Sequence, residues 1–363
     1  MPIADKPQSS PGQDADKALR TVVIGLGTMG LSHAHAYHEN PGFQIVGLHN
    51  RSPVALPDDL ADYPWCDSFE AALALRPDLV SINTYTDSHA DFAVRAMEAG
   101  AHVFLEKPLA GSMAEARRIA ETAERTGAKL VVGYILQHHP SWQRFIAEAR
   151  RLGPPFVFRL NLNQRSFGAA WETHKRLMKT TSPIVDCGVH YLDVMLRITD
   201  AAPVQVRGMG VRLSEEIAET QVNYGHLQVL FADGSVGWYE AGWGPMMSDT
   251  AFFVKDVVGP KGAVSIVMEE GAASADHDTH TRTSRIRIQP AAPAPGGAAP
   301  ADVSIDLADE PRHQELCARE QAFVLRAIRE DLDLTRHRED ALRSLAVVLA
   351  ADRSMREGRA INL

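Results

Sequence analysis

Short apolar runs alternate with helical segments along the first 140 residues of the chain. The apolar runs lie at 21–24, 43–48, 77–83, 103–105 and 130–132. The segments between them carry helix signals, such as the Ser112-x-x-Glu115 capping box and the stop at Gly127. Buried strands that alternate with helices predict a parallel, doubly wound sheet. Ligands bind such a sheet at the carboxyl ends of its strands, so we look for chemistry there.

The second half of the chain has a different pattern. Gly153-Pro154-Pro155 ends a helix predicted over 141–151 and marks a boundary. Extended runs follow at 156–163, 204–213, 221–231, 235–243, 251–258 and 263–268. A hairpin turn at Asp233-Gly234 joins two of them, so we expect an antiparallel sheet. Two amphipathic helices, at about 311–330 and 339–357, end the chain, and a low-complexity segment at 291–300 predicts a mobile loop.

These patterns predict an α/β protein with two folded domains. We place a disordered tail at 1–18, a dinucleotide-binding domain at 19–140 and a substrate-binding and oligomerisation domain at 141–363. The tail is polar and contains no apolar signal core. The length of 363 residues suits two domains.

Charge and cysteine content narrow the classes of partner. The net charge is −9 and no long basic patch occurs, so we expect no nucleic acid partner. No apolar run approaches the roughly 18 residues of a membrane span. The three cysteines are widely spaced, which favours a reduced, cytoplasmic protein over a disulfide framework or a zinc site. The histidine pairs His33/His35 and His138/His139 lack the carboxylate or cysteine spacing of a metal site, so we predict no metal.

A glycine-rich loop follows the first strand directly. Its sequence is Gly25-Leu26-Gly27-Thr28-Met29-Gly30, and a helical segment begins at Leu31. In a strand–GxGxxG–helix arrangement the glycines permit a tight turn, a close approach of the pyrophosphate and packing of helix on strand. The phosphates bind at the helix amino terminus. We therefore predict a dinucleotide site that includes Gly25, Gly27, Thr28, Met29 and Gly30.

The end of the second strand indicates which dinucleotide is preferred. An NAD site usually places an acidic residue about 20 residues after the glycines, on the ribose hydroxyl. Here that position is Asn50, and Arg51 follows. An arginine without a neighbouring carboxylate suits a 2′-phosphate, so NADP is slightly favoured. In the alternative, Asn50 binds the ribose of NAD and Arg51 is solvated.

Two further strand ends carry polar residues. Thr84 and Tyr85 follow the third strand, and Glu106 and Lys107 follow the fourth. Carboxyl ends of parallel strands meet at one edge of the sheet, so we expect these residues beside the cofactor. Lys107 would then face the nicotinamide. A surface lysine before a proline is the alternative.

The residues that predict catalysis lie on one helix of the second half. Ser182 and Pro183 are a standard helix start. Asp186 and His190 are four residues apart and Asp193 follows three later, so all three share a face. A carboxylate beside an imidazole fixes its tautomer and raises its basicity. The alternative is a buried histidine that is satisfied by a helical aspartate.

A polar segment precedes this helix. It contains Trp171, His174, Lys175 and Arg176, and we predict it to be a loop that contacts a polyhydroxylated substrate. A solvated loop without such a role is the alternative. Lys179, just before the helix, is a further candidate for substrate binding.

Three motifs, in this order, resemble the glucose–fructose oxidoreductase/inositol dehydrogenase (Gfo/Idh/MocA) family. They are the loop 25–30, Glu106-Lys107-Pro108 and the block Asp186-x-Gly-x-His190-x-x-Asp193. The loop from Asn83 to His89 is also similar, although Tyr85 replaces a usual proline. A glycine-rich run that many members have before the Asp186 block is here Lys-Thr-Thr-Ser-Pro, which leaves the substrate open.

The resemblance implies a Rossmann domain followed by an α/β domain with an open, largely antiparallel sheet. It implies that Lys107, Asp186 and His190 are catalytic and contact the substrate, and that His89 and Pro108 belong to the cofactor site. The peptide before Pro108 is often cis in this family. A broad sheet face commonly pairs subunits, so a homodimer or homotetramer is expected.

The function that the resemblance implies is hydride transfer between a nicotinamide cofactor and a secondary hydroxyl or ketone of a sugar or cyclic polyol. Two alternatives within the family stay open: an NAD-assisted glycoside hydrolase and a regulator that binds a nucleotide without chemistry. A dihydrodiol or imine reductase would differ only in the shape of its pocket.

Overall fold

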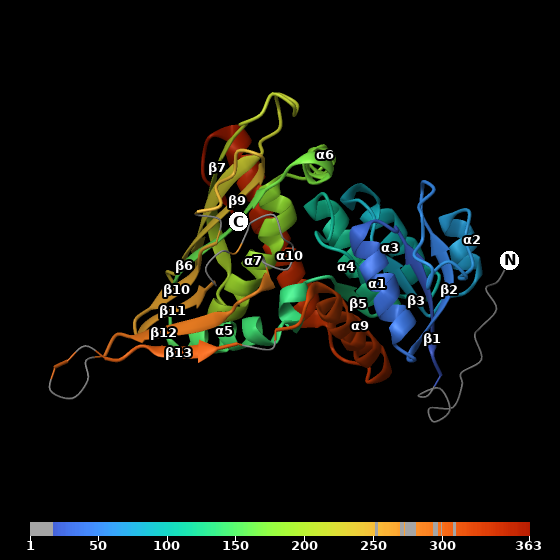
Figure 1. Ribbon diagram of the computed structural model, residues 1–363, viewed down its shortest axis with the longest axis horizontal. Coiled ribbons are helices and arrows are strands. Elements are labelled where there is room, and N and C mark those ends of the chain that lie inside the picture. Colours follow the sequence, from blue (N-terminus) through green and yellow to red (C-terminus); the bar gives the residue numbers. More distant parts are fainter. Residues whose placement is uncertain are drawn as a thin grey trace.

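The computed structural model contains two sheets with helices between and around them (Figure 1). It describes residues 17–250, 253–268, 272, 281–292, 297–298, 300–307 and 310–363. Residues 1–16 of the predicted tail, and residues 293–296 and 299 of the predicted loop at 291–300, lie outside these ranges. No helix in the described ranges is both long enough and apolar enough to cross a membrane.

The N-terminal sheet is parallel, as the strand pattern predicted. Its strand order is β2-β1-β3-β4-β5. The strands are β1 (Leu19–Ile24), β2 (Phe43–His49), β3 (Leu79–Ile82), β4 (His102–Leu105) and β5 (Leu130–Val132). The helices that accompany them are α1 (Thr28–Glu39), α2 (Phe69–Ala74), α3 (His89–Glu98) and α4 (Met113–Thr126), with the 3₁₀ turns η1 (Thr86–Ser88) and η2 (Ile135–His138). The runs of β1 and β3 form central strands, where most of their side chains are buried.

The C-terminal sheet is mixed and mostly antiparallel. Its order is β13-β12-β11-β10-β6-β9-β8-β7-β14, and only the β6–β9 pair among these described strands is parallel. The strands are β6 (Val157–Arg165), β7 (Pro203–Val211), β8 (Tyr224–Phe231), β9 (Val236–Gly244), β10 (Lys255–Gly259), β11 (Gly262–Val267), β12 (Arg285–Pro290), β13 (Val303–Asp306) and β14 (Ile361–Asn362). The predicted turn at Gly234 is present, with a φ of 84°.

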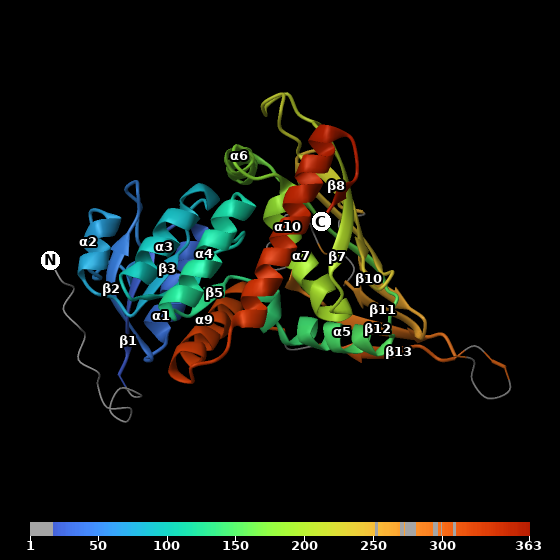
Figure 2. The same cartoon turned by 180° about the vertical axis from the view of Figure 1, so that it is seen from behind.

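Helices cover one face of this sheet and leave the other open. The helices that contact the sheet are α5 (Pro140–Arg151), α6 (Gly168–Leu177), α7 (Pro183–Thr199) and α10 (Thr335–Glu357); α9 (His313–Arg329) lies before α10 in the chain. α7 packs on β8 and β9, α10 packs on α7 and β7, and α5 packs on β10 and β11. Figures 1 and 2 show α7 and α10 between the large sheet and the Rossmann unit.

The last two helices also hold the Rossmann unit. α9 lies against α1, and α10 lies against α4 and β5. Tyr37 of α1 donates a hydrogen bond to Gln321 of α9 over 2.7 Å, and Tyr134 and Ser344 of α10 share one of 2.8 Å. The end of the chain therefore contributes residues to the core of both units.

One local prediction is wrong. The segment that contains Trp171, His174, Lys175 and Arg176 is not a loop but helix α6. Trp171 and His174 lie almost one turn apart and are both buried, while Lys175 pairs with Glu172 on the exposed side. The segment is amphipathic, and the number of charged residues obscured its short apolar stripe.

Candidate active site

The glycine loop has the geometry that a dinucleotide requires. Gly25 has a φ of 86°, and a Cβ at this position would lie 2.6 Å from the carbonyl oxygen of Asn83. A Cβ at Gly30 would collide with the carbonyl oxygen of Gly25, whereas one at Gly27 would point into open space. Gly27 precedes the first turn of α1, which contains no acidic side chain. The loop therefore offers helix N–H groups to an anionic ligand without steric obstruction.

Asn50 connects the end of β2 to this loop. Its Oδ1 accepts a hydrogen bond from the backbone N–H of Leu26 over 3.0 Å, and its Nδ2 donates to the carbonyl of Ser52 over 2.8 Å. Arg51 is exposed, and no carboxylate in the described ranges forms an ion pair with it. The predicted pair thus consists of an asparagine that braces the loop and an arginine that faces solvent.

His89 connects two other loops at this edge of the sheet. It is fully buried, its Nδ1 lies 2.9 Å from the carbonyl oxygen of Pro108, and its Nε2 lies 3.1 Å from that of Thr84. Burial lowers the pKa of His89, although the two carbonyl contacts oppose the shift. Tyr85 is 43% exposed and stands on the outside of the same loop. Both ring nitrogens of His89 therefore contact backbone carbonyl groups, and neither faces an open site.

Lys107 lies at the end of β4 and reaches across to the second unit. Its peptide bond to Pro108 is cis, as the family resemblance implied. Nζ lies 3.0 Å from Oδ2 of Asp186 and 3.3 Å from the backbone oxygen of Asp186. Burial alone would lower the pKa of Lys107, but the Asp186 carboxylate raises it above its ordinary value. Lys107 is therefore a cation at neutral pH, held by one carboxylate.

The start of α7 places this carboxylate. Ser182 caps the helix, since its hydroxyl accepts the N–H of Val185 over 3.2 Å, and Pro183 is the first helical residue. Both features were predicted from the sequence. Asp186 lies in the first turn, where the helix dipole favours a negative charge. Local capping thus fixes the position of the Asp186 carboxylate, and Lys107 from the Rossmann unit forms an ion pair with it.

His190 follows one turn later but is not hydrogen-bonded as its spacing suggested. Its Nδ1 is buried without a hydrogen-bond partner among the described residues, and Oδ2 of Asp186 is engaged by Lys107 instead. Burial and the positive charge of Lys107 lower the pKa of His190 to about 3, and the charges of Glu106 and Asp186 oppose that shift. The imidazole is consequently unprotonated at neutral pH and is able to accept a proton.

Asp193, which shares the helix face, belongs to a different network. Both of its carboxylate oxygens accept hydrogen bonds of 2.9 Å from Gln137, and Arg197 donates to it over 3.0 Å. It braces α7 against η2. The second aspartate of the motif is thus structural in its described contacts.

The sequence analysis missed how Glu106 is held. This carboxylate is buried and accepts a hydrogen bond of 2.8 Å from Nε2 of His33 and one of 3.0 Å from the backbone N–H of Lys107. Burial alone would raise its pKa, but the hydrogen bond from His33, together with the charge of Lys107, lowers it. The available signal was His33 itself, three residues after the last loop glycine on a helix face that turns inward.

The two remaining substrate candidates lie near α6. Trp171 is buried in α6, and the ammonium of Lys175 lies 5.7 Å from the centroid of its ring system. Lys179 is exposed, with no ion pair to any described carboxylate. Figures 1 and 2 place α6 between the large sheet and the Rossmann unit. No polar contact among the described residues joins either side chain to the Lys107–Asp186 pair, so their contribution to a substrate site stays a prediction.

Comparison with known families matches almost the whole described chain. Residues 19–134 match the model of an oxidoreductase family with an NAD-binding Rossmann fold. Residues 147–363 match the C-terminal alpha/beta domain of the same family. The two matches meet close to the boundary between the two sheets.

Individual relatives are more distant. UDP-N-acetylglucosamine 3-dehydrogenase of Acidithiobacillus ferrooxidans is 31% identical over 53% of this chain and 58% of its own length. Its crystal structure covers 94% of this chain and 99% of its own, with a TM-score of 0.73 at 22% identity. The scyllo-inositol 2-dehydrogenase (NAD(+)) of Bacillus subtilis is 27% identical over 61% of this chain and 67% of its own length. GenD2 from gentamicin A biosynthesis, solved in complex with NAD, has a TM-score of 0.75 at 20% identity and covers 99% of both chains.

Proposed function

The chain belongs to the Gfo/Idh/MocA oxidoreductase family, and from this premise we propose that it transfers hydride between a nicotinamide cofactor and a secondary hydroxyl or ketone of a sugar or cyclic polyol. The observation that carries the proposal is the Lys107–Asp186 pair at the carboxyl edge of the Rossmann sheet, with the unprotonated His190 one turn further along α7. Similar proteins are named as dehydrogenases of inositols and of a nucleotide sugar, which supports this substrate class.

Each of the three residues has a distinct proposed role. His190 accepts the hydroxyl proton, because its imidazole is neutral at physiological pH. The Lys107 ammonium donates to the same oxygen and stabilises the negative charge that develops there. Asp186 holds Lys107 in place through the 3.0 Å contact. A bound nicotinamide supplies the hydride acceptor at C4.

We propose that the cofactor is NADP rather than NAD, by a small margin. The support is the exposed Arg51 beside an asparagine instead of a carboxylate. The name of the Bacillus subtilis relative and the bound NAD of GenD2 favour the alternative. In that case Asn50, which already braces the glycine loop, lies beside the ribose.

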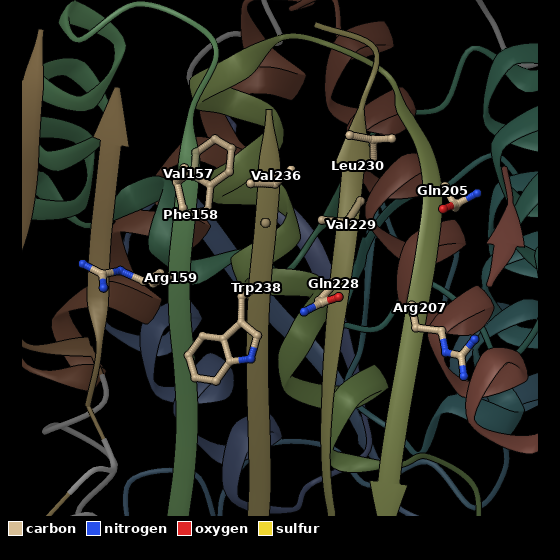
Figure 3. A pocket seen from close by; sticks show the side chains of 11 residues that line it. Val157, Phe158, Arg159, Gln205, Arg207, Gln228, Val229, Leu230, Val236 and Trp238 are labelled. Atoms are coloured by element: carbon tan, nitrogen blue, oxygen red, sulfur yellow. The ribbon is translucent and has the colours of Figure 1, made fainter. Parts of the chain in front are cut away.

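The open face of the large sheet supports a second proposal, that two copies of this chain pair through it. Figure 3 shows side chains of β6, β9, β8 and β7 on this face, among them the partly exposed Trp238. Val157, Leu230 and Val236 are 42%, 40% and 43% exposed there. Arg159 and Asp256 form an ion pair with each other on this face. A twofold interface brings the same patch of each copy together, and an apolar patch in which these charges are already paired can be buried in this way.

One experiment separates the proposed function from its alternatives. The purified protein is mixed with NAD(+) or NADP(+) and a panel of myo-inositol, scyllo-inositol, methyl glucosides, UDP-N-acetylglucosamine and nitrophenyl glycosides. Formation of reduced nicotinamide with a polyol or sugar supports the dehydrogenase. Release of nitrophenol without net reduction would identify the glycoside hydrolase instead, and tight binding of dinucleotide without either reaction would favour the regulator.

A further inference from the structure

Glu106 lies next to the proposed catalytic lysine and has two described hydrogen-bond donors. Oε2 accepts the backbone N–H of Lys107 over 3.0 Å, and Oε1 accepts from Nε2 of His33 over 2.8 Å. His33 is fully buried on α1, and its ring packs against Phe104 at a centroid distance of 4.6 Å. Nothing in the proposed chemistry uses His33, yet it supplies one of the two donors to this carboxylate.

A residue from the end of the chain determines which nitrogen of His33 carries the hydrogen. Nε2 of Gln321 lies 2.9 Å from Nδ1 of His33, and Oε1 of Gln321 accepts the hydroxyl hydrogen of Tyr37 over 2.7 Å. Because the phenol occupies the amide oxygen, the amide nitrogen of Gln321 points to His33 and donates to it. Nδ1 is therefore an acceptor, which leaves the hydrogen on Nε2, where it meets Glu106.

We infer that His33 is a positioning residue for the proposed hydride transfer: fixed in its Nε2–H tautomer by Gln321 of α9, it holds the Glu106 carboxylate, which in turn holds the backbone of Lys107. The inference rests on the proposed function only for its effect on rate. The hydrogen-bond chain runs from α9 through α1 to the end of β4, so docking of the last helices is coupled to the placement of the lysine.

The chain of hydrogen bonds also has an electrostatic effect, because it holds the negative charge of Glu106. Glu106 acts electrostatically on Lys107 and on His190, and it raises the pKa of each. Glu320 of α9 is buried near Glu106, and burial together with that negative charge raises the pKa of Glu320 well above its usual value. Glu106 has His33 within hydrogen-bond distance, whereas Nε2 of His138 lies 4.0 Å from Oε1 of Glu320. Loss of the hydrogen bond from His33 would therefore raise the pKa of Glu106 and make this carboxylate easier to protonate than in the unchanged protein.

The first test observes the tautomer directly and needs no substrate. The protein with ¹⁵N-labelled histidine is measured by long-range ¹H–¹⁵N correlation at pH 8, and the His33 signals are identified by their loss in His33→Gln. We expect Nε2 to carry the hydrogen and Nδ1 to be bare. A hydrogen on Nδ1, or a mixture of both tautomers, would overturn the inference. Gln321→Leu, which removes the donor to Nδ1, should produce such a mixture.

The second test compares two substitutions of the same residue. The carboxamide nitrogen of glutamine in His33→Gln reaches the place of Nε2 and still donates to Glu106, whereas asparagine in His33→Asn reaches only the place of Nδ1. With the most active substrate of the panel, we expect kcat of His33→Asn to fall about tenfold or more, the usual effect of losing a hydrogen bond to a charged group. KM for the dinucleotide should change little, and His33→Gln should recover most of kcat.

His35→Asn is the matched control. His35 lies on the same helix two residues later, half-exposed and paired with Asp59 over 2.9 Å, outside the chain of hydrogen bonds to Glu106. Equal kcat values for His33→Asn and His33→Gln, with the fold intact by circular dichroism, would contradict the positioning role. If the unchanged protein reduces neither cofactor with any compound of the panel, the proposed function fails, but the tautomer measurement still decides the inference about His33 and Gln321.

Discussion

Nζ of Lys107 and Oδ2 of Asp186 lie 3.0 Å apart although 79 residues separate them in the chain. Lys107 belongs to the loop after β4, and Asp186 belongs to the first turn of α7, so their contact joins the Rossmann unit to the helix that carries His190. Both side chains are partly exposed, at 20% and 14%. The pair therefore faces a space that a ligand can reach, while burial, assisted by the charge of Lys107, lowers the pKa of His190 one turn further along α7.

Replacement of Lys107 by methionine should affect both rate and protonation. Lys107→Met keeps the length of the side chain but removes the donor to the substrate oxygen, so turnover should fall about 100- to 1,000-fold. Lys107 lowers the pKa of His190, so the pKa of His190 should rise above its value of about 3 in the unchanged protein. A titration of the His190 ring signal by ¹H–¹³C NMR measures this shift. An unchanged or lower pKa would show that Lys107 does not act on His190, and Lys261→Met, in an exposed turn, is the control.

His190→Ala should lower turnover strongly but preserve the cofactor site. General base catalysis contributes about 10²- to 10⁴-fold, and we expect a loss of this size in kcat. The glycine loop and Asn50 are on other elements, so the dissociation constant for the dinucleotide, measured by fluorescence titration, should stay the same. Near-normal turnover in this variant would assign the proton transfer to another group.

Residues that act through local structure were predictable from the sequence, and those that act through tertiary contacts were not. The start of α7 was predicted because Ser182 and Pro183 are cap signals of the helix they begin. The three loop glycines were predictable because the strand–GxGxxG–helix pattern is also local in the sequence. In contrast, the hydrogen bond from His33 to Glu106 spans 73 residues, and the binding of Lys107 to Asp186, rather than of His190 to Asp186, depends on how two domains meet.

The edge strands β13 and β14, and β12 beside β13, were also missed. β12 and β13 alternate polar with apolar residues and are largely exposed, and β14 has only two residues that pair with β7. Edge strands bury little apolar surface, so they lack the continuous runs by which β1 and β3 are recognised. Each of these strands forms only because another strand pairs with it, and the periodicity of its own sequence does not reveal that partner.

The cofactor preference is testable at a single position. If Arg51 binds a 2′-phosphate, Arg51→Ala should weaken binding of NADPH while leaving NADH nearly unaffected. Fluorescence titration with both reduced cofactors, in the unchanged protein and in the variant, gives the four dissociation constants required. Tighter binding of NADH that does not respond to Arg51→Ala would contradict the NADP proposal and favour Asn50 as a ribose ligand.

If two copies pair through the open sheet face, charged substitutions on that face should reduce the mass of the assembly in solution. Val236→Glu combined with Leu230→Glu places two buried charges of the same sign in each half of a twofold interface, so the protein should become monomeric. Light scattering coupled to size-exclusion chromatography measures the mass. Val303→Glu, on the edge strand β13 and equally exposed, is the control and should leave the assembly intact. An oligomer that survives the double substitution would place the interface elsewhere.

Acid should destabilise the fold through His337. This side chain is buried on α10, and its Nε2 accepts the backbone N–H of Val132 at the end of β5 over 2.9 Å. Burial, assisted by the positive charge of Arg197, lowers the pKa of His337 to about 3. The unfolded chain, with an ordinary histidine pKa of about 6.5, binds a proton that the folded protein does not, so stability is complete above pH 6.5 and falls as the pH drops towards 3.

Two substitutions separate this titration from the hydrogen bond. Between pH 6 and 4, one such histidine contributes about 1.4 kcal/mol per pH unit to the slope of the unfolding free energy. His337→Gln removes the titration but retains an acceptor for Val132, so the slope should decrease by about that amount while stability at pH 8 changes little. His337→Leu removes both, so the slope should decrease equally and stability should be lower at every pH by about 1–3 kcal/mol. Urea unfolding at a series of pH values measures both quantities, and an unchanged slope in His337→Gln would show that His337 is not the buried neutral histidine.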